Sequence, residues 1–431
     1  MEEETKVLNP LSYKPIGNLL KSLAIPAIIA NLVNALYNVV DQIFIGQGIG
    51  YLGNAATNIA FPITTMCLAI GLTLGIGGAS NFNLELGKGY PEKSKHTAGT
   101  AASTLIIIGI ILCIVVRIFL EPLMIGFGAT DKILEYSIEY TGITSYGIPF
   151  LLFSIGVNPL VRADGNAKYS MIAIVTGAIL NTILDPLFMF VYNWGIAGAA
   201  WATVISQIVS ALLLLIYFPR FKSVKFSLND FIPQLHYLKR IVSLGFASFI
   251  YQFSNMIVLV TTNNLLKIYG KNSIYGSDIP IAVFGIVMKI NVIFIAIVLG
   301  LVQGAQPIFG FNYGAKNYHR VRETMRLLLK VTFSIASILF VIFQVFIIHI
   351  SYMHIFVKPF PKIFRNIFHS LYIFKKFSKS KIEFIKINLA LYNYAPAKMI
   401  ELNQTGTAKP FIQSLNKHHP FIQGNLKSTF S

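Results

Sequence analysis

The sequence predicts an all-α protein that crosses a membrane many times. Of its 431 residues, 55% are hydrophobic and only 12% are charged. The apolar residues gather in runs of about 20, the length that an α-helix needs to cross a hydrocarbon core about 30 Å thick. A mean hydropathy of +0.65 is typical of the same class. We therefore expect a polytopic helical membrane protein rather than a soluble domain.

About nine runs are long enough to be membrane spans. We place them at approximately 20–45, 55–82, 97–120, 136–160, 169–192, 195–218, 241–266, 279–311 and 323–350. The first run is longer than the core of a signal peptide and has no obvious small-residue cleavage site, so we expect it to be retained.

Basic residues in the connections predict the orientation of the chain. They gather before the first span and after the second, fourth, sixth and eighth spans, as in Lys14, Lys93, Lys168, Arg220 and Arg322. The positive-inside rule then places the N-terminus in the cytoplasm. We expect a multi-pass protein of the plasma (inner) membrane. The net charge of +18 belongs to this pattern, and we expect no nucleic-acid partner.

An internal repeat relates the first spans to the seventh and eighth. Ser22-Leu23 matches Ser243-Leu244, Asn34 matches Asn255, and Gly77 and Gly87 match Gly304 and Gly314. Copies that start on the same side predict two parallel helical lobes, related by an axis along the membrane normal, with a cavity between them. We expect a six-span N-lobe at 1–218, a cytoplasmic linker at 219–240 and a partial C-lobe of about three spans at 241–350.

The stretch 351–431 breaks the pattern. It holds twelve Lys and Arg residues against Glu383 and Glu401, and no run in it is long and uncharged enough to span a membrane. One interpretation is a peripheral tail that lies on an anionic lipid surface. The other is a reading frame that shifts after about residue 350, which would leave three of an expected six C-lobe spans.

Two carboxylates at membrane depth are the main functional candidates. Asp185 has Asn181 one helical turn before it and Pro186 after it, and Asp41 ends a one-face polar stripe that begins at Asn31. Acids inside membrane spans are costly and usually functional. Both lie in the outer halves of their spans, where they could share a proton or bind a small cation, with Asn181 and Thr203 as further oxygen donors. The alternatives are a brace at the Pro186 break and, for the asparagines, hydrogen bonds between helices.

Other chemistry has little support in the sequence. There is no GxxxxGK[ST] loop for ATP, no His/Cys cluster with metal-ligand spacing and no serine–histidine pair. We therefore expect neither an enzyme nor a cofactor. Lys289 is a basic residue inside the eighth span, where it could pair with substrate or extend to an interface. The glycines of GLVQGAQP, at Gly300 and Gly304, are expected to pack helices closely.

Three motifs together resemble the multidrug and toxic compound extrusion family. They are VDQIFIGQGIG (40–50), NTILDPLFMFVYNWGIAGAAWATVISQ (181–207) and GLVQGAQPIFGFNYGAKNY (300–318). The resemblance covers about residues 15–350 and implies two six-helix lobes, alternating access and efflux of cationic drugs driven by Na⁺ or H⁺. It also implies that Asp41, Asn181, Asp185 and Thr203 match the cation-coupling site, as candidate ligands of Na⁺ or a proton. The chain departs from the family where the last three helices are expected.

We expect a monomer that exports small lipophilic cations and contacts membrane lipid. The residues that we expect to line its substrate cavity are Asn34, Tyr37, Asn38, Gln207, Asn255 and Lys289. One alternative is a lipid-linked oligosaccharide flippase of related architecture, whose anionic substrate would need several inward-facing Arg or Lys residues. Another is a truncated remnant that transports nothing.

Overall fold

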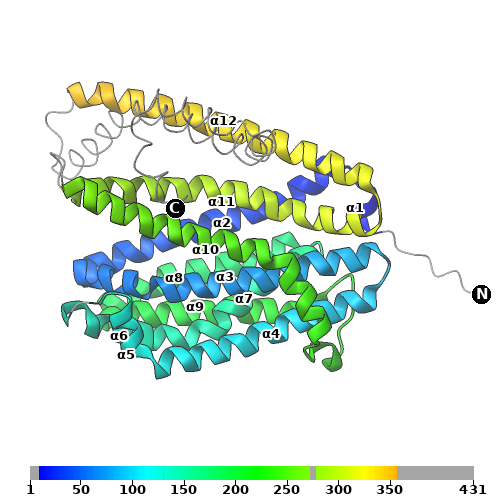
Figure 1. Cartoon of the computed structure of the whole chain (residues 1–431), viewed down its shortest axis with the longest axis horizontal. Helices are drawn as coiled ribbons and strands as arrows, with labels where there is room; N and C mark the ends of the chain where they lie inside the picture. Colours follow the sequence, from blue (N-terminus) through cyan, green and yellow to red (C-terminus); the bar gives the residue numbers. More distant parts are fainter. Residues whose placement is uncertain (1–8, 130, 272–277, 357–431) are drawn as a thin grey trace, which may run out of the picture. The chain divides into compact units, whose positions relative to one another are not determined.

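The computed structural model describes residues 9–129, 131–271 and 278–356, and every regular element in these ranges is helical. In the first half of the chain the elements are α1 (Pro10–Tyr13), α2 (Ile16–Gly48), α3 (Tyr51–Gly87), α4 (Pro91–Ile118), α5 (Leu120–Gly126), α6 (Asp131–Thr144), η1 (Ser145–Gly147), α7 (Ile148–Ala163) and α8 (Ala167–Pro186). They are followed by η2 (Leu187–Val191), α9 (Gly195–Tyr217), η3 (Phe218–Arg220), η4 (Leu228–Phe231), α10 (Leu235–Lys271), α11 (Asp278–Gly314) and α12 (Tyr318–Phe356). Figure 1 shows their order along the chain.

The helices confirm the predicted fold class. Within the described ranges, nine segments are long and apolar enough to cross a membrane, and they coincide with the nine predicted runs. The fourth span differs in detail, because α6 and α7 follow one another through the short 3₁₀ turn η1 to form one segment, Asp131–Ala163. The predicted lobe boundaries remain predictions, and most of the predicted tail, 357–431, lies outside the described residues.

Small residues allow the N-lobe helices, α2 to α9, to approach closely. A Cβ built on Gly75 of α3 would lie 2.7 Å from the Cα of Gly156 in α7, so the two backbones touch at this crossing. Gly177 of α8 packs in the same way against Ser210 of α9. Helices in lipid associate through such close packing, since the surrounding acyl chains remove the usual hydrophobic driving force.

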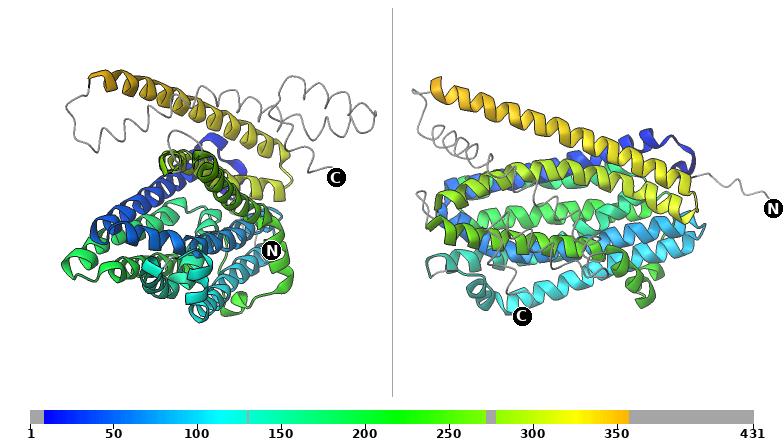
Figure 2. Two further views of the ribbon diagram at one scale, coloured as in Figure 1. Left: turned by 60° about the vertical axis from the view of Figure 1, so that its left-hand side comes forward. Right: turned by 45° about the horizontal axis from the view of Figure 1, so that its top comes forward.

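The internal repeat is visible as a reciprocal set of contacts. A Cβ at Gly87 of α3 would overlap the carbonyl oxygen of Phe311 in α11, and a Cβ at Gly314 of α11 would overlap that of Leu84 in α3. The repeat aligns Gly87 with Gly314 and Leu84 with Phe311, so each contact is the two-fold image of the other. Figures 1 and 2 show α3 beside α10 and α2 beside α11, which are equivalent pairs.

The linker after α9 is folded against the N-lobe. Asp164 accepts hydrogen bonds from the backbone N–H groups of Lys222 (2.9 Å) and Ser223 (2.8 Å) and from the Tyr217 hydroxyl (2.8 Å). Burial raises the pKa of the Asp164 carboxyl, and these hydrogen bonds offset part of the increase. Further along, the 3₁₀ turn η4 rests on α4, where Gly99 leaves room for the carbonyl of Asp230.

Candidate functional site

Asp185 lies where α8 changes its helical geometry. Pro186 has no N–H to donate to the carbonyl four residues earlier, and the chain continues from it as the π-helical turn η2. Such π-helical turns occur often at functional sites because they redirect side chains within a span. The Asp185 side chain is fully buried, with 0% of its surface exposed, and Asn181 one turn earlier is 2% exposed.

The amide of Asn181 joins α8 to α9. Its Nδ2 donates to Asp185 Oδ1 at 3.1 Å and lies 3.5 Å from the Thr203 hydroxyl oxygen. A buried carboxylate needs such donors, because an unpaired buried charge is strongly unfavourable. The sequence predicted that Asn181 and Asp185 share a helical face, and in the structure the two side chains hydrogen-bond to each other while Asn181 also reaches Thr203.

Asp41 reaches this group from α2. The carboxyl groups of Asp41 and Asp185 lie close enough to interact with each other directly. Ionised carboxylates only accept hydrogen bonds, so two of them can hydrogen-bond only when a proton lies between them. The geometry of the pair therefore suits a shared proton or a small cation that takes its place.

The site has more acceptors than donors. Asp41 Oδ1, Asp185 Oδ2 and Asn181 Oδ1 are buried, and within the described part of the chain none of them receives a hydrogen bond. Carboxylate and amide oxygens are the ligands that hard cations prefer. The residues present thus fit Na⁺ or a proton as cargo. Among the described residues, no cluster of three or more His, Cys, Asp or Glu side chains could hold a metal ion.

Two tyrosines border the carboxyl pair. Tyr37, from α2, was predicted, and it interacts electrostatically with both Asp41 and Asp185. Tyr140, from α6, was not predicted, although it interacts electrostatically with the same two acids and lies near Thr203. No local pattern distinguishes Tyr140 from Tyr136 one turn earlier, and only the packing of α6 on α9 brings it to the site.

The polar stripe of α2 divides between two roles. Asn31 donates to Gln303 Oε1 (3.3 Å) and to the carbonyl of Ala296 (3.4 Å), both in α11. This is the helix-joining role that the sequence left open for the asparagines. Asn34 and Asn38 are exposed, and the Asn38 amide donates to the Asn34 carbonyl at 2.6 Å.

The remaining cavity candidates are not gathered around the carboxyl pair. The amide oxygen of Gln207 packs against Gly147 of η1, one turn beyond Thr203 on α9. Asn255 is exposed on α10. The side chain of Lys289 lies outside the described residues, so the prediction that it lines a cavity remains a prediction.

An apolar cluster lies next to the site on the side of the α2 C-terminus. Ile45 and Met189 each follow one of the two acids by four residues and pack together with Ala199 of α9. Phe44 and Phe190 meet edge to face beside them, with ring centroids 6.3 Å apart. This cluster, here called the apolar seal (Ile45, Met189 and Ala199), lies one helical turn beyond the two acids, toward the C-terminus of α2.

Comparison with known proteins identifies the family. The MatE family model matches residues 26–187 and 243–355, which is more than half of the chain and includes Asp41, Asn181 and Asp185. The chain belongs to the multidrug and toxic compound extrusion (MatE) family. The members of this family are transporters and not enzymes, which confirms the prediction that the chain is a transporter and not an enzyme.

The relatives of this MatE protein include multidrug export proteins. It is 25% identical over 311 residues to the multidrug export protein MepA of Staphylococcus haemolyticus, covering 71% of this chain and 66% of MepA. It is also 25% identical to MepA of Staphylococcus aureus over 314 residues, which cover 72% of this chain and 68% of that protein. The chain therefore spans about two thirds of the length of the curated relatives that it matches.

Solved structures of transporters share the fold of this chain. A multidrug resistance MATE family transporter described in an outward-facing conformation superposes with a TM-score of 0.74 and 27% identity, over 82% of this chain and 77% of the other. A MOP superfamily transporter from Pyrococcus furiosus superposes with a TM-score of 0.72 and 26% identity, over 81% and 76% of the two chains. The latter is described by a reversed polarity of its binding pocket, suggesting a different function.

Proposed function

We propose that this MatE protein exports small lipophilic cations in exchange for inward flow of Na⁺ or H⁺. The observation that carries the proposal is the carboxyl pair, Asp41 and Asp185, in which Asp41 Oδ1 and Asp185 Oδ2 are buried and receive no hydrogen bond from the described residues. The multidrug export activity in the names of its relatives supports the same direction of transport. The distribution of basic residues supports a multi-pass orientation in the plasma membrane with a cytoplasmic N-terminus.

The exchange follows from charge competition. When Asp41 and Asp185 are both ionised, their repulsion favours any cation that comes near, and a lipophilic cation can be held beside Tyr37. A proton or Na⁺ that binds between the two carboxyl groups neutralises this charge. The drug then loses its electrostatic partner and leaves. Asn181, which also bonds to Thr203, keeps the Asp185 carboxyl in place through both steps.

The alternative of an oligosaccharide-lipid flippase requires a different kind of site. Its anionic pyrophosphate substrate would be stabilised by Arg or Lys side chains. The group assembled here consists of two acids, an amide and hydroxyl groups. An acidic site attracts cations, and we therefore favour cation export.

Efflux of ethidium from energised cells tests the proposal. Asp41→Asn and Asp185→Asn should each reduce efflux by about tenfold or more, because each removes the charge that binds both cations. Asp131→Asn is the matched control, since Asp131 is exposed at the start of α6, and it should retain efflux. Full efflux in both site variants would refute the proposal. Separate Na⁺ and H⁺ gradients imposed on proteoliposomes then identify the coupling ion.

A further inference from the structure

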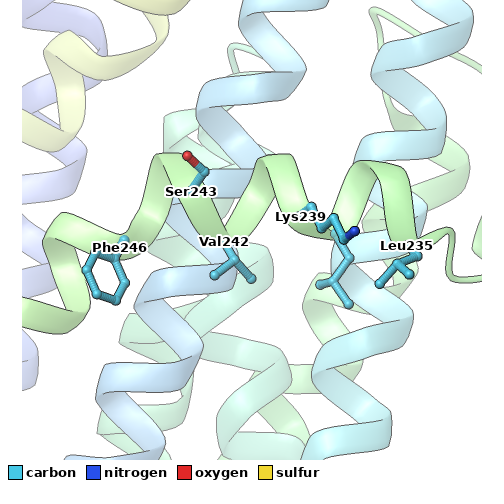
Figure 3. Close-up of a pocket in the computed structure, with 6 residues that line it drawn as sticks. Leu235, Lys239, Val242, Ser243 and Phe246 are labelled. Atoms are coloured by element: carbon cyan, nitrogen blue, oxygen red, sulfur yellow. The ribbon is translucent and has the colours of Figure 1, made fainter.

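The first turns of α10 carry an open groove outside the proposed transport site. It has a volume of about 500 Å³ and is lined by Leu235, Leu238, Lys239, Val242, Ser243 and Phe246. Each of these residues has another lining residue three or four positions away, so together they form one stripe along the helix. Figure 3 shows Val242 and Phe246 along the helix and the Lys239 nitrogen directed toward the Leu235 end. Lys239 is the cation among the lining residues, and the apolar Val242 and Phe246 follow it along the helix.

Lys239 is a cation without an anion. The carboxylates described near this end of the helices have other partners, since Glu85 pairs with Lys88 and Asp230 lies beside Lys95 and His96. No described residue forms an ion pair or hydrogen bond with Lys239. The Ser243 hydroxyl also lacks a hydrogen bond in the described chain, whereas Thr73 donates to the carbonyl four residues earlier, at 2.6 Å.

The internal repeat allows the stripe on α10 to be compared with the equivalent residues of α2. Ser243 corresponds to Ser22 of α2, and Phe246 corresponds to Ile25. In the N-lobe, which has all six spans, Lys21 and Ser22 are exposed and Ile25 is 52% exposed. The equivalent face of a six-span lobe is therefore not covered by another helix. By symmetry, the groove on α10 is a surface that faces lipid.

We propose that this groove binds an anionic phospholipid, with its phosphate at Lys239 and an acyl chain along Val242 and Phe246. The positive-inside pattern predicts that this end of α10 lies at the cytoplasmic leaflet, where anionic lipids and basic side chains meet. A zwitterionic lipid gains less, because its amine finds no free carboxylate beside Lys239. Ile241 and Gly245, in the same turns, contact α3 through their backbone, so the groove runs beside a helix contact that the bound lipid does not replace.

Fluorescence quenching by brominated lipids tests the proposal on the full chain in liposomes. Trp194 and Trp201 are replaced by Phe, and Phe246→Trp places the reporter in the groove. Brominated phosphatidylglycerol should bind at the reporter with about fivefold preference over brominated phosphatidylcholine, the effect expected of one lysine at a membrane surface. Lys239→Gln should abolish the preference and Lys239→Arg should keep it. Lys225→Gln, which changes an exposed linker lysine outside the groove, is the matched control and should have no effect.

Each other outcome overturns the inference. Equal quenching by the two lipids would mean an ordinary lipid-facing surface without a headgroup site. Absence of quenching by either lipid would mean that protein covers the groove. Circular dichroism and size-exclusion profiles show whether each variant is folded. Because the assay measures lipid contact and not transport, its result is independent of the proposed export activity.

Discussion

The amide of Asn181 donates to the Asp185 carboxyl at 3.1 Å while the same nitrogen lies 3.5 Å from the Thr203 hydroxyl oxygen. One side chain thereby fixes the acid of α8 relative to α9. The amide oxygen of the same side chain is buried and receives no hydrogen bond from the described residues. The amide both positions the acid and adds an acceptor for a cation.

Replacing Asn181 by Ala should weaken ion coupling. The change removes the donor to a fully buried carboxyl, a loss that costs about 1–3 kcal/mol, and it deletes one candidate cation ligand. We expect the concentration of Na⁺ or H⁺ that gives half-maximal efflux to shift about tenfold, measured in proteoliposomes. Thr182→Ala is the control, since that neighbouring hydroxyl donates only within α8, to the Ala178 carbonyl. Identical ion dependence in wild type and Asn181→Ala would show that the amide has no part in coupling.

Tyr140→Phe tests the site residue that the sequence did not reveal. The variant keeps the ring and removes the hydroxyl that lies near Thr203 and interacts electrostatically with the two acids. We expect efflux to fall about threefold to tenfold, because the hydroxyl borders the carboxyl pair. Thermal stability should change little, because the ring is kept and a single hydroxyl contributes on the order of 1 kcal/mol. Tyr136→Phe, one turn earlier on α6, should behave like wild type. Equal effects of the two substitutions would assign Tyr140 to general packing.

The spans and the pair of acids could be predicted because they depend on local properties. Hydropathy over about 20 residues determines which segments cross lipid, and a spacing of four residues places Asn181 and Asp185 on one face. Even the contact of Asp41 with Asp185 was suggested by two acids at similar depth.

The rest of the site depends on how each helix is rotated about its own axis. Asn31 and Asp41 share a stripe, yet Asn31 faces α11 and Asp41 faces α8, since α2 lies between these two helices. The approach of Gly304 to Ala24 sets that packing. Tyr140 and the apolar seal likewise depend on contacts between helices distant in sequence, which no local pattern contains.

The reciprocal contact of Gly87 and Gly314 predicts a matched pair of variants. Gly87→Ala and Gly314→Ala each place a methyl group against a carbonyl oxygen of the other helix, so both should separate α3 from α11. The separation of the two helices can be followed at position 80, because the Ser80 hydroxyl accepts a hydrogen bond from Gln306 of α11 at 3.0 Å. Ser80→Cys is introduced as the labelling site after Cys67 and Cys113 are replaced by Ala. Maleimide labelling at position 80 should accelerate about fivefold or more in both variants.

Gly17→Ala is the control for these two substitutions. A Cβ at Gly17 meets nothing within 4 Å, and alanine favours the helix, so labelling at position 80 should stay at the wild-type rate. An increase in only one of the two test variants would contradict the two-fold relationship between the contacts. Unchanged labelling in both would mean that the glycines are not required for close approach.

Asp230 should make the stability of the linker depend on pH. Burial alone would raise its pKa, but hydrogen bonds from the backbone and hydroxyl of Ser227 and the charges of Lys95 and His96 outweigh burial and lower it. A carboxyl whose pKa is lower in the folded state stabilises it above the unfolded pKa of about 3.9, and this stabilisation is lost as pH falls through the folded pKa. Asp230→Asn should therefore lower Tm at pH 7, and the gap from wild type should narrow at about pH 3.5.

Asp164→Asn provides the opposite sign. The pKa of Asp164 is raised by burial, so its ionisation destabilises the folded state as pH rises from the unfolded to the folded pKa. Acidification protonates Asp164 and so removes the free-energy cost of burying its charge in wild type. Asparagine does not ionise, so acidification brings the Asp164→Asn variant no such gain. The Tm gap between wild type and Asp164→Asn should thus widen at low pH, where the Asp230→Asn gap narrows. Parallel trends in the two variants would mean that the two acids do not hold the linker in the way their hydrogen bonds indicate.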